Sequence, residues 1–466
     1  MITIYLDKQV FSYLFNAKEG DKYAILRDKI LTHKDEFIFI YSNAHLFDLQ
    51  DDQTPIKYDE MEFMQSIVDG NRLIYEASKQ EIIKQSPRDA FETIVKLGDF
   101  SWLEDFDILQ LTEEQRKTIN NIIDISIKDL KGELDFDWLR KRTPISSDEL
   151  QVDISTFKSL MHSIAYNFYE DKDAYKRLRD RTIANYNPKA IKADGEEIFN
   201  EQLLSSPLGL SFIETVKATL SQTGLPSSDL ATAYYVSYIL LDLYGVNKES
   251  RKKVQYRNMQ VDSYHSFFGS YCDCIVSDDE GLRRKSKTLY KLFNLGTQVY
   301  SVDEFIEKFN EAVNNNKKTA REYFDEIIDD YIAKQVLRTE TTPEHTLTHL
   351  KTFHKYFGYF SYMVERVSSD ETVIMLHKNT DLTQPILGRE IEILVNRMVR
   401  AFNEMGANCV LFDAMVELPQ LRSDTWQRVL ILNDAEISLT KFKDTPMLCL
   451  WIKLKQPILA TSNKIP

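Results

Sequence analysis

The sequence predicts a mixed α/β protein that begins as a doubly wound parallel sheet. Three short apolar runs carry this prediction: Ile2–Leu6, Phe37–Tyr41 and Cys274–Val276. Phe37–Tyr41 is too apolar on both faces for a surface hairpin, and Cys274–Val276 fits a buried parallel strand. Strands that alternate with helices form such sheets, and their sites lie at the carboxyl ends of the strands.

The first strand ends at Asp7, and we expect helices over Lys8–Asn16 and Lys22–Leu31 before the second strand begins. This order is one strand–helix crossover. It brings the carboxylate of Asp7 to the edge of the sheet where a site is expected.

The second strand is followed by Ser42, a residue type that favours the N-cap of a helix. A short helix over Asn43–Leu49 would then carry His45 and Asp48 within one turn of each other. A second carboxylate is therefore expected at the same edge of the sheet.

The pattern of strands disappears between Glu60 and Asn258, where apolar residues recur with helical spacing and prolines separate the segments. We expect helices over Met61–Ile67, Glu113–Leu130, Thr156–Tyr169, Asp173–Asn185, Gly209–Ser221 and Ser228–Tyr244. We interpret this stretch as a mostly helical insertion, which either caps the first domain or shapes a substrate channel.

The sheet pattern returns with Asp262 and His265 on a helix, the strand Cys274–Val276, an acidic turn and a helix with a basic start that closes at Gly296. The polar run Asn314–Lys318 then marks a boundary. These breaks predict a first sheet segment (1–59), the insertion (60–258), a second sheet segment (259–315) and a C-terminal α/β or α+β unit (316–466).

Within the C-terminal unit we expect two long helices followed by an alternation of strands and helix. The helices are Thr319–Leu337 and Glu344–Glu365, and the later elements are Thr372–Leu376, Arg389–Met405, Cys409–Glu417, Trp426–Thr440 and Met447–Lys455.

Composition limits the classes of function. The net charge of −14 argues against a general nucleic-acid coat protein but allows an enzyme with a local basic patch. Four cysteines in 466 residues form no disulfide framework, which favours a reducing cytoplasm. We see no signal peptide and no apolar run of the length that spans a membrane, about 18 residues.

Four carboxylates are the main candidates for chemistry: Asp7, Asp48, Asp262 and Asp279. Clustered carboxylates repel one another unless a divalent cation binds, and Mg²⁺ and Mn²⁺ prefer such oxygen ligands. Such an ion lowers the pKa of a bound water and polarises a phosphate.

The order of these residues resembles PIN-like nucleases, including the VapC-type toxin ribonucleases. The resemblance covers Met1–Gln50 and about Val246–Phe305. It rests on Ile-Tyr-Leu-Asp7, on Ser42 to Leu49 after the second strand, on Asp262, and on Ser277-Asp278-Asp279. Asp48 replaces the commoner Glu of that family, Ser277 replaces Thr, and the long insertion is a larger departure.

The resemblance implies that Asp7, Asp48, Asp262 and Asp279 hold Mg²⁺ or Mn²⁺, with Ser277 in support. A one-residue slip in the pattern would select Asp278 in place of Asp279. His45 and His265 each lie three residues from an acidic candidate. They either orient a carboxylate, contact a phosphate, or are hydrogen-bonded helix histidines.

A basic run comes directly after the acidic turn and would place positive charge beside the metal site. Contacts of such groups with phosphates position a substrate without reading its sequence. The residues of the run are Arg283, Arg284, Lys285 and Lys287.

We therefore expect a metal-dependent nuclease that acts on RNA in preference to DNA, as a regulated effector of stress or phage defence. The alternative is a non-catalytic PIN-like scaffold that binds nucleic acid or a protein partner. The C-terminal unit would engage a partner or activator in either case. A phosphoryl-transfer enzyme of another α/β type would show Asp-x-Asp where this chain has Asp7-Lys8-Gln9.

Overall fold

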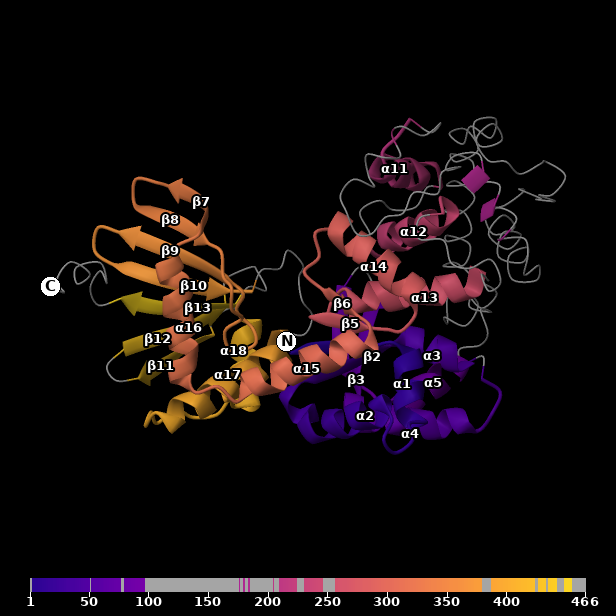
Figure 1. Cartoon of the computed structure of the whole chain (residues 1–466), viewed down its shortest axis with the longest axis horizontal. Coiled ribbons are helices and arrows are strands. Elements are labelled where there is room, and N and C mark those ends of the chain that lie inside the picture. Colours follow the sequence, from indigo (N-terminus) through magenta and orange to yellow (C-terminus); the bar gives the residue numbers. More distant parts are fainter. Residues whose placement is uncertain are drawn as a thin grey trace, which may run out of the picture. The chain divides into compact units, whose positions relative to one another are not determined.

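A computed structural model describes residues 2–50, 52–76, 79–96, 209–223, 230–245, 256–378, 387–423, 426–432, 435–441 and 448–454, with isolated residues between 176 and 204. They form a mixed α/β protein with two sheets (Figure 1). One compact unit comprises Met1–Ile4, Glu19–Phe39 and Val302–Pro466, and the other comprises Tyr5–Lys18 and Ile40–Ser301. The four-part division predicted from the sequence stays a prediction.

The first sheet has six strands in the order β4-β3-β2-β1-β5-β6. They are β1 (Thr3–Leu6), β2 (Ile38–Ser42), β3 (Asn71–Glu76), β4 (Lys79–Lys84), β5 (Cys274–Val276) and β6 (Gln298–Tyr300). The pairs β2–β3 and β5–β6 are parallel, and β3–β4 is antiparallel. Every residue of β1 and β2 is buried, as the apolar runs predicted for strands covered on both faces.

Helices connect these strands and follow them in sequence. They are α1 (Lys8–Phe15), α2 (Lys22–His33), the 3₁₀ helix η1 (Lys34–Glu36), α3 (Asn43–Gln50), α4 (Ile56–Val68), α5 (Pro87–Lys96), α11 (Phe212–Thr223), α12 (Leu230–Leu243), α13 (Tyr256–Gly269), α14 (Glu280–Leu292) and α15 (Val302–Asn316). Among the helices that the structure describes, none combines the length and apolar character that a membrane crossing needs.

The interpretation of residues 60–258 as a mostly helical insertion is wrong at its start. Strands β3 and β4 lie there and extend the first sheet, with Leu73 fully buried. The strands were missed because Asn71–Glu76 mixes charged and apolar residues and follows the left-handed turn at Asp69 and Gly70. Helices α11 and α12 agree with the prediction. The helices expected over 113–130 and 156–169 lie outside the described residues, and of 173–185 only isolated residues are described.

The second sheet is antiparallel and has seven strands in the order β11-β12-β13-β10-β9-β8-β7. They are β7 (Val336–Thr341), β8 (His345–Leu350), β9 (Tyr362–Ser368), β10 (Thr372–His377), β11 (Gln427–Leu432), β12 (Ala435–Lys441) and β13 (Leu448–Leu454). The accompanying helices are α16 (Ala320–Ala333), α17 (Leu387–Glu404) and α18 (Ala414–Arg422). Tyr331 of α16 donates a hydrogen bond of 2.5 Å to Glu365 of β9, which fastens this helix to the sheet.

Two elements expected in the C-terminal part are wrong. The helix over Glu344–Glu365 is replaced by β8 and β9, because His-Thr-Leu-Thr-His-Leu alternates along a strand and a left-handed turn at Phe357 and Gly358 interrupts any helix. The strand expected over Cys409–Glu417 is replaced by α18, whose N-cap Asp413 accepts a hydrogen bond from the backbone of Met415.

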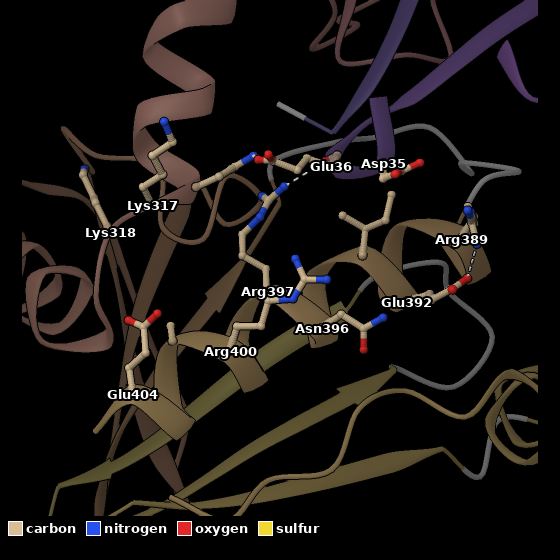
Figure 2. Close-up of a pocket in the computed structure, with 13 residues that line it drawn as sticks. Asp35, Glu36, Lys317, Lys318, Arg389, Glu392, Asn396, Arg397, Arg400 and Glu404 are labelled. Atoms are coloured by element: carbon tan, nitrogen blue, oxygen red, sulfur yellow. Dashed lines mark hydrogen bonds and ion pairs between the residues drawn. The ribbon is translucent and has the colours of Figure 1, made fainter. Parts of the chain in front are cut away.

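A buried arginine ties α17 to two other segments of the same unit (Figure 2). Nη1 of Arg397 donates to the carbonyl of Phe357 at 2.6 Å, and Nη2 donates to the carbonyl of Glu36 at 3.1 Å. The guanidinium lines a pocket of about 190 Å³ between η1, the end of α15 and α17. Gly358 lies against it with a φ of +67°, and a Cβ there would be 2.5 Å from Nη1.

Gly358→Ala is expected to lower the free energy of unfolding by about 1–3 kcal/mol, because the backbone is left-handed there and the added carbon meets the Arg397 guanidinium. Urea denaturation measures the change. Gly20→Ala is the matched control, since Gly20 has a φ of +83° and no atom within 4 Å of its added carbon. Equal losses in both variants would show that the guanidinium makes no tight contact at Gly358.

The fold disfavours the protonated form of two histidines of the second sheet. Burial and the charge of Arg338 lower the pKa of His349, against the opposing effect of Glu340. Burial also lowers the pKa of His377, with a further contribution from His349. Tyr362 lies between the two rings, with centroid distances of 5.8 Å to His349 and 4.7 Å to His377.

These two histidines are therefore expected to contribute a loss of stability as the pH drops below about 6.5, the usual pKa of histidine in an unfolded chain. In that range the unfolded state binds more protons at His349 and His377 than the folded state does, so protonation favours unfolding. His349→Gln/His377→Gln should show a shallower decline between about pH 6.5 and pH 5 in urea denaturation. An unchanged slope would contradict this assignment.

Candidate metal centre

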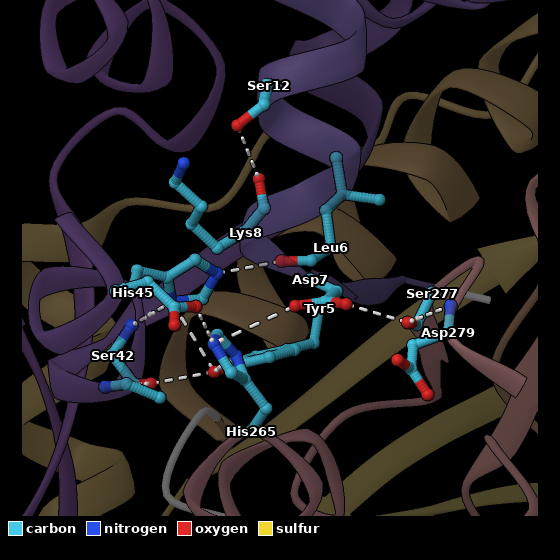
Figure 3. Close-up of polar contacts among 12 residues, drawn as sticks. Tyr5, Leu6, Asp7, Lys8, Ser12, Ser42, His45, His265, Ser277 and Asp279 are labelled. Carbon is cyan, nitrogen blue, oxygen red and sulfur yellow. Dashed lines mark hydrogen bonds and ion pairs between the residues drawn. The ribbon is translucent and has the colours of Figure 1, made fainter. Parts of the chain in front are cut away.

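Three side chains converge at the carboxyl end of β1. Figure 3 shows two of them, Asp7 and His265. Asp7 follows β1, Asp48 lies on α3 and His265 lies on α13, and one ligand atom of each lies within 4.8 Å of the other two. Nε2 of His265 is 2.9 Å from Oδ2 of Asp48 and 3.7 Å from Oδ1 of Asp7. Asp7 and His265 are buried, whereas the side chain of Asp48 is 34% exposed, so solvent reaches the group beside Asp48.

Val276 and Ser277, at the end of β5, fix the position of Asp7. The backbone N–H of Asp7 donates to the carbonyl of Val276 at 2.9 Å. The hydroxyl of Ser277 donates to Oδ2 of Asp7 at 2.7 Å and accepts the backbone N–H of Asp279 at 3.0 Å. Ser277 therefore orients Asp7 and leaves its Oδ1 toward His265, the supporting role expected from the sequence.

Tyr5 orients the imidazole of His265 from the opposite side. Its hydroxyl lies 2.9 Å from Nδ1 of His265 and 2.7 Å from Oγ of Ser42 (Figure 3). When Nδ1 carries the proton, it donates to Tyr5, Tyr5 donates to Ser42, and Nε2 is left with a lone pair facing the two carboxylates. Such a partner on the second nitrogen is what positions a metal-binding histidine.

His45 serves the fold at this site. Its Nδ1 accepts the backbone N–H of Ser42 at 3.1 Å, so its Nε2 carries the proton and donates to the carbonyl of Leu6 at 2.7 Å. Burial, together with the neighbouring His265, lowers the pKa of His45 well below its usual value. This neutral imidazole fastens α3 to the end of β1, so of the two roles considered for His45 the structural one fits.

Burial raises the pKa of Asp7, because the charged form loses water, and the carboxylates of Asp48 and Asp279 add to the increase. His265 and the hydroxyl of Ser277 act in the opposite direction. Burial alone would lower the pKa of His265, but its hydrogen bond to Asp48 and the charge of Asp7 outweigh that effect and raise it. The two carboxylates and the imidazole therefore form one coupled charge cluster.

This donor set fits a divalent metal ion. Two carboxylate oxygens and an imidazole nitrogen come from three separate elements and face one another over less than 5 Å. Mg²⁺ prefers oxygen ligands alone, whereas transition ions accept imidazole and Mn²⁺ also suits carboxylates. The presence of His265 thus favours Mn²⁺ over Mg²⁺.

The other expected carboxylates lie outside the group of three. Asp262 is half-buried on α13, one helical turn before His265. Asp279 is the N-cap of α14, and its Oδ1 accepts the backbone N–H of Leu282 at 2.8 Å. It is still close enough to affect the pKa of Asp7. Oδ1 of Asp278 lies 4.0 Å from the guanidinium of Arg283.

The residues of the basic run on α14 differ in their contacts and in their exposure. Arg283 donates to the carbonyl of Ser277 at 2.7 Å, Arg284 pairs with Glu280, and Lys287 is exposed. Lys287 and the half-buried Arg283 and Arg284 therefore remain candidates for a phosphate contact.

The expectation that Lys285 contacts nucleic acid is wrong, because its side chain is only 1% exposed. Its Nζ lies 3.1 Å from Oδ1 of Asp242 on α12, and Nη1 of the buried Arg179 lies 3.6 Å from Oδ2 of the same carboxylate. A buried lysine needs such a partner, and it has no route to a phosphate outside the protein.

Two contributions to the site were missed from the sequence. His265 was expected only to support a carboxylate, and Tyr5 was read as a strand residue. The alternation along β1 places Tyr5 on the opposite face from Leu6, and Asp262 and His265 share one side of a helix, but neither pattern shows which polar atoms meet.

Tyr5→Phe is expected to weaken Mn²⁺ binding by about 10–100-fold, because the hydrogen bond that orients His265 is lost while the ring still fills its place. Isothermal titration calorimetry with MnCl₂ measures the affinity. Tyr41→Phe is the matched control, since its hydroxyl donates to the carbonyl of Gln85 away from the cluster. Equal affinities of Tyr5→Phe and the wild type would rule out an orienting role for Tyr5.

No family model, no curated protein and no solved structure matches this chain.

Proposed function

We propose that the chain is a metal-dependent nuclease with a PIN-like α/β domain. The observation that carries this proposal is the convergence of Asp7, Asp48 and His265 at the carboxyl end of β1. The strand order supports it, because β1 lies beside β5 and the residues that follow these two strands, Asp7 and Ser277, meet at the same end of the sheet. The resemblance of the sequence to PIN-like nucleases supplies the reaction class.

The bound ion is proposed to be Mn²⁺, or Mg²⁺ with lower affinity, held by Asp7, Asp48 and His265. A divalent ion supplies positive charge that lowers the pKa of water and offsets the charge of a phosphodiester. Ser277 keeps Asp7 in place, and Tyr5 keeps the lone pair of His265 directed at the ion. Asp48, the exposed member, marks the side from which the substrate arrives.

The substrate is proposed to be single-stranded RNA, by resemblance to the VapC-type ribonucleases. Lys287 is exposed on the helix that begins at Asp279, where a phosphate contact would add affinity without sequence preference. The net charge of −14 restricts such contacts to a local patch.

A non-catalytic scaffold is the second candidate, and one observation favours it. Nε2 of His265 lies 2.9 Å from Oδ2 of Asp48, so a protonated imidazole between the two carboxylates offsets one of their two negative charges with no metal bound. On this alternative the three residues hold α3 and α13 to β1, and the protein binds its partner without cleaving it.

The decisive test incubates the full chain with labelled single-stranded RNA and DNA in Mn²⁺, Mg²⁺ or EDTA. We expect cleavage that requires metal, prefers Mn²⁺ and falls by more than about 100-fold in Asp7→Asn, Asp48→Asn and His265→Gln, beyond the loss typical of residues that only orient a ligand. Glu280→Gln removes a nearby carboxylate that pairs with Arg284, and it should retain activity.

Calorimetry with MnCl₂ on the same variants separates the two candidates. A nuclease loses metal binding together with cleavage in the three variants. If the wild type neither binds Mn²⁺ nor cleaves RNA or DNA, the scaffold is the correct assignment. Asp262→Asn, tested in parallel, reports whether the carboxylate one turn before His265 contributes to either property.

A further inference from the structure

The second sheet ends in an edge strand, β7, whose outer side pairs with no other described strand. Strand β7 has β8 as its neighbour on one side, and all six of its residues are exposed. Val336 is 52% exposed and Leu337 is 55% exposed. An exposed edge strand presents backbone donors and acceptors to any strand that can align with it. At the opposite edge, by contrast, Arg428 of β11 donates to the carbonyls of Val410 and Leu411, so a loop lies against that strand.

The register of β7 with β8 determines which backbone groups point outward. The N–H of Thr342 donates to the carbonyl of His345, and the pairs Glu340↔Leu347 and Thr339↔Thr348 follow along the ladder. Hydrogen-bonded and non-hydrogen-bonded pairs alternate in an antiparallel ladder. Glu340 therefore bonds with β8, whereas the N–H and C=O of Thr339 and Thr341 point away from the sheet.

Arg338 and Glu340, on either side of Thr339, have opposite charges that are self-complementary across a two-fold axis. When two β7 strands run antiparallel with Thr339 opposite Thr339, Arg338 of each copy lies opposite Glu340 of the other. These are non-hydrogen-bonded pairs across the new ladder, in which side chains are closest, about 4.5 Å between Cα atoms. Within one chain the same two side chains already share a face, at 3.2 Å.

We propose that two copies of this chain dimerise by pairing their β7 strands edge to edge, antiparallel, with Thr339 on the two-fold axis. The joined sheets form one continuous antiparallel sheet of fourteen strands, twice the seven of one copy. The new ladder uses the outward N–H and C=O groups of Thr339, and Arg338 and Glu340 set the register. The interface also lies beside the exposed apolar residues Ile332, Val336 and Leu337, which a second copy would shield from water.

A second copy is favoured over an unrelated strand because the charges are symmetric about Thr339. A two-fold interface brings the same patch of both copies together, so each residue must suit its symmetry mate. Arg338 and Glu340 meet this requirement in the register centred on Thr339, whereas a register centred on Arg338 or on Glu340 places like charges opposite each other. The inference is independent of the metal centre, whose residues follow β1 (Asp7) or lie on α3 (Asp48) and α13 (His265).

The test measures the molar mass of the full chain by light scattering after size exclusion, over a dilution series in the micromolar range. We expect the wild type at twice the 54.5 kDa of one chain. Arg338→Glu and Glu340→Arg each place like charges opposite one another at both ends of the interface, so each variant alone should be monomeric. Arg321→Glu, an equal charge change on an exposed residue of α16, should remain dimeric.

Mixing the two monomeric variants distinguishes pairing between chains from the contact within a chain. A mixed dimer places Glu side chains of one copy opposite Arg side chains of the other at both positions, so an equimolar mixture should regain the dimer mass. The contact within each chain remains broken in the mixture and cannot produce this rescue. Thr339→Pro removes an outward N–H that β8 does not use, so it should also be monomeric, with the melting temperature of the monomeric Arg338→Glu variant.

Three results would overturn the proposal. The first is a wild type that stays monomeric throughout the dilution series. The second is a dimer that persists in both Arg338→Glu and Thr339→Pro, because such a dimer uses another surface. The third is a mixture of the two charge variants that stays monomeric, because the register centred on Thr339 requires the mixed pair to form.

Discussion

The candidate centre depends on the burial of one carboxylate. Removing an ionised carboxylate from water costs several kcal/mol, and the cost must be offset by hydrogen bonds and opposite charge. Asp7 obtains these from the hydroxyl of Ser277 and the imidazole of His265. Both partners belong to a part of the chain that begins some 250 residues later. The burial of Asp7 therefore becomes favourable only when β5 and α13 have joined β1. The centre and the sheet thus stabilise each other.

The long separation between the two halves of the sheet has a modest thermodynamic cost. Ser277 and Asp7 are 270 positions apart, yet the entropy of closing a loop grows only with the logarithm of its length. Each doubling of the loop adds about 0.6 kcal/mol, less than one buried hydrogen bond to a charged group contributes. The segment between β4 and α13 could therefore be long without weakening the pairing of β1 with β5. Contacts at the centre then favour the native pairing of β1 with β5 over other ways of closing the loop.

Sequence patterns predicted the features that depend on local chemistry. The apolar runs located β1, β2 and β5, and the polar residue after each strand located Asp7 and Ser277. The patterns failed where tertiary contacts determine the role of a residue or the place of a strand. The role of His265 as a candidate ligand depends on a hydroxyl from β1, which no spacing on α13 reveals. Strand β3 mixes charged and apolar residues, and its place in the sheet comes from pairing with β2. One helix was expected over β8 and β9 because the left-handed turn at Gly358, which lies against Arg397, does not show in the sequence pattern.

The buried ion cluster of Lys285, Asp242 and Arg179 has a consequence for how this chain can be divided. Lys285 belongs to α14, which begins at the metal centre, whereas Asp242 belongs to the long segment between the two halves of the sheet. Excising that segment would remove both the counter-charge of Lys285 and α12, the helix that packs against α14. Helix α12 is therefore part of the compact unit that carries the centre, and it is not a removable attachment.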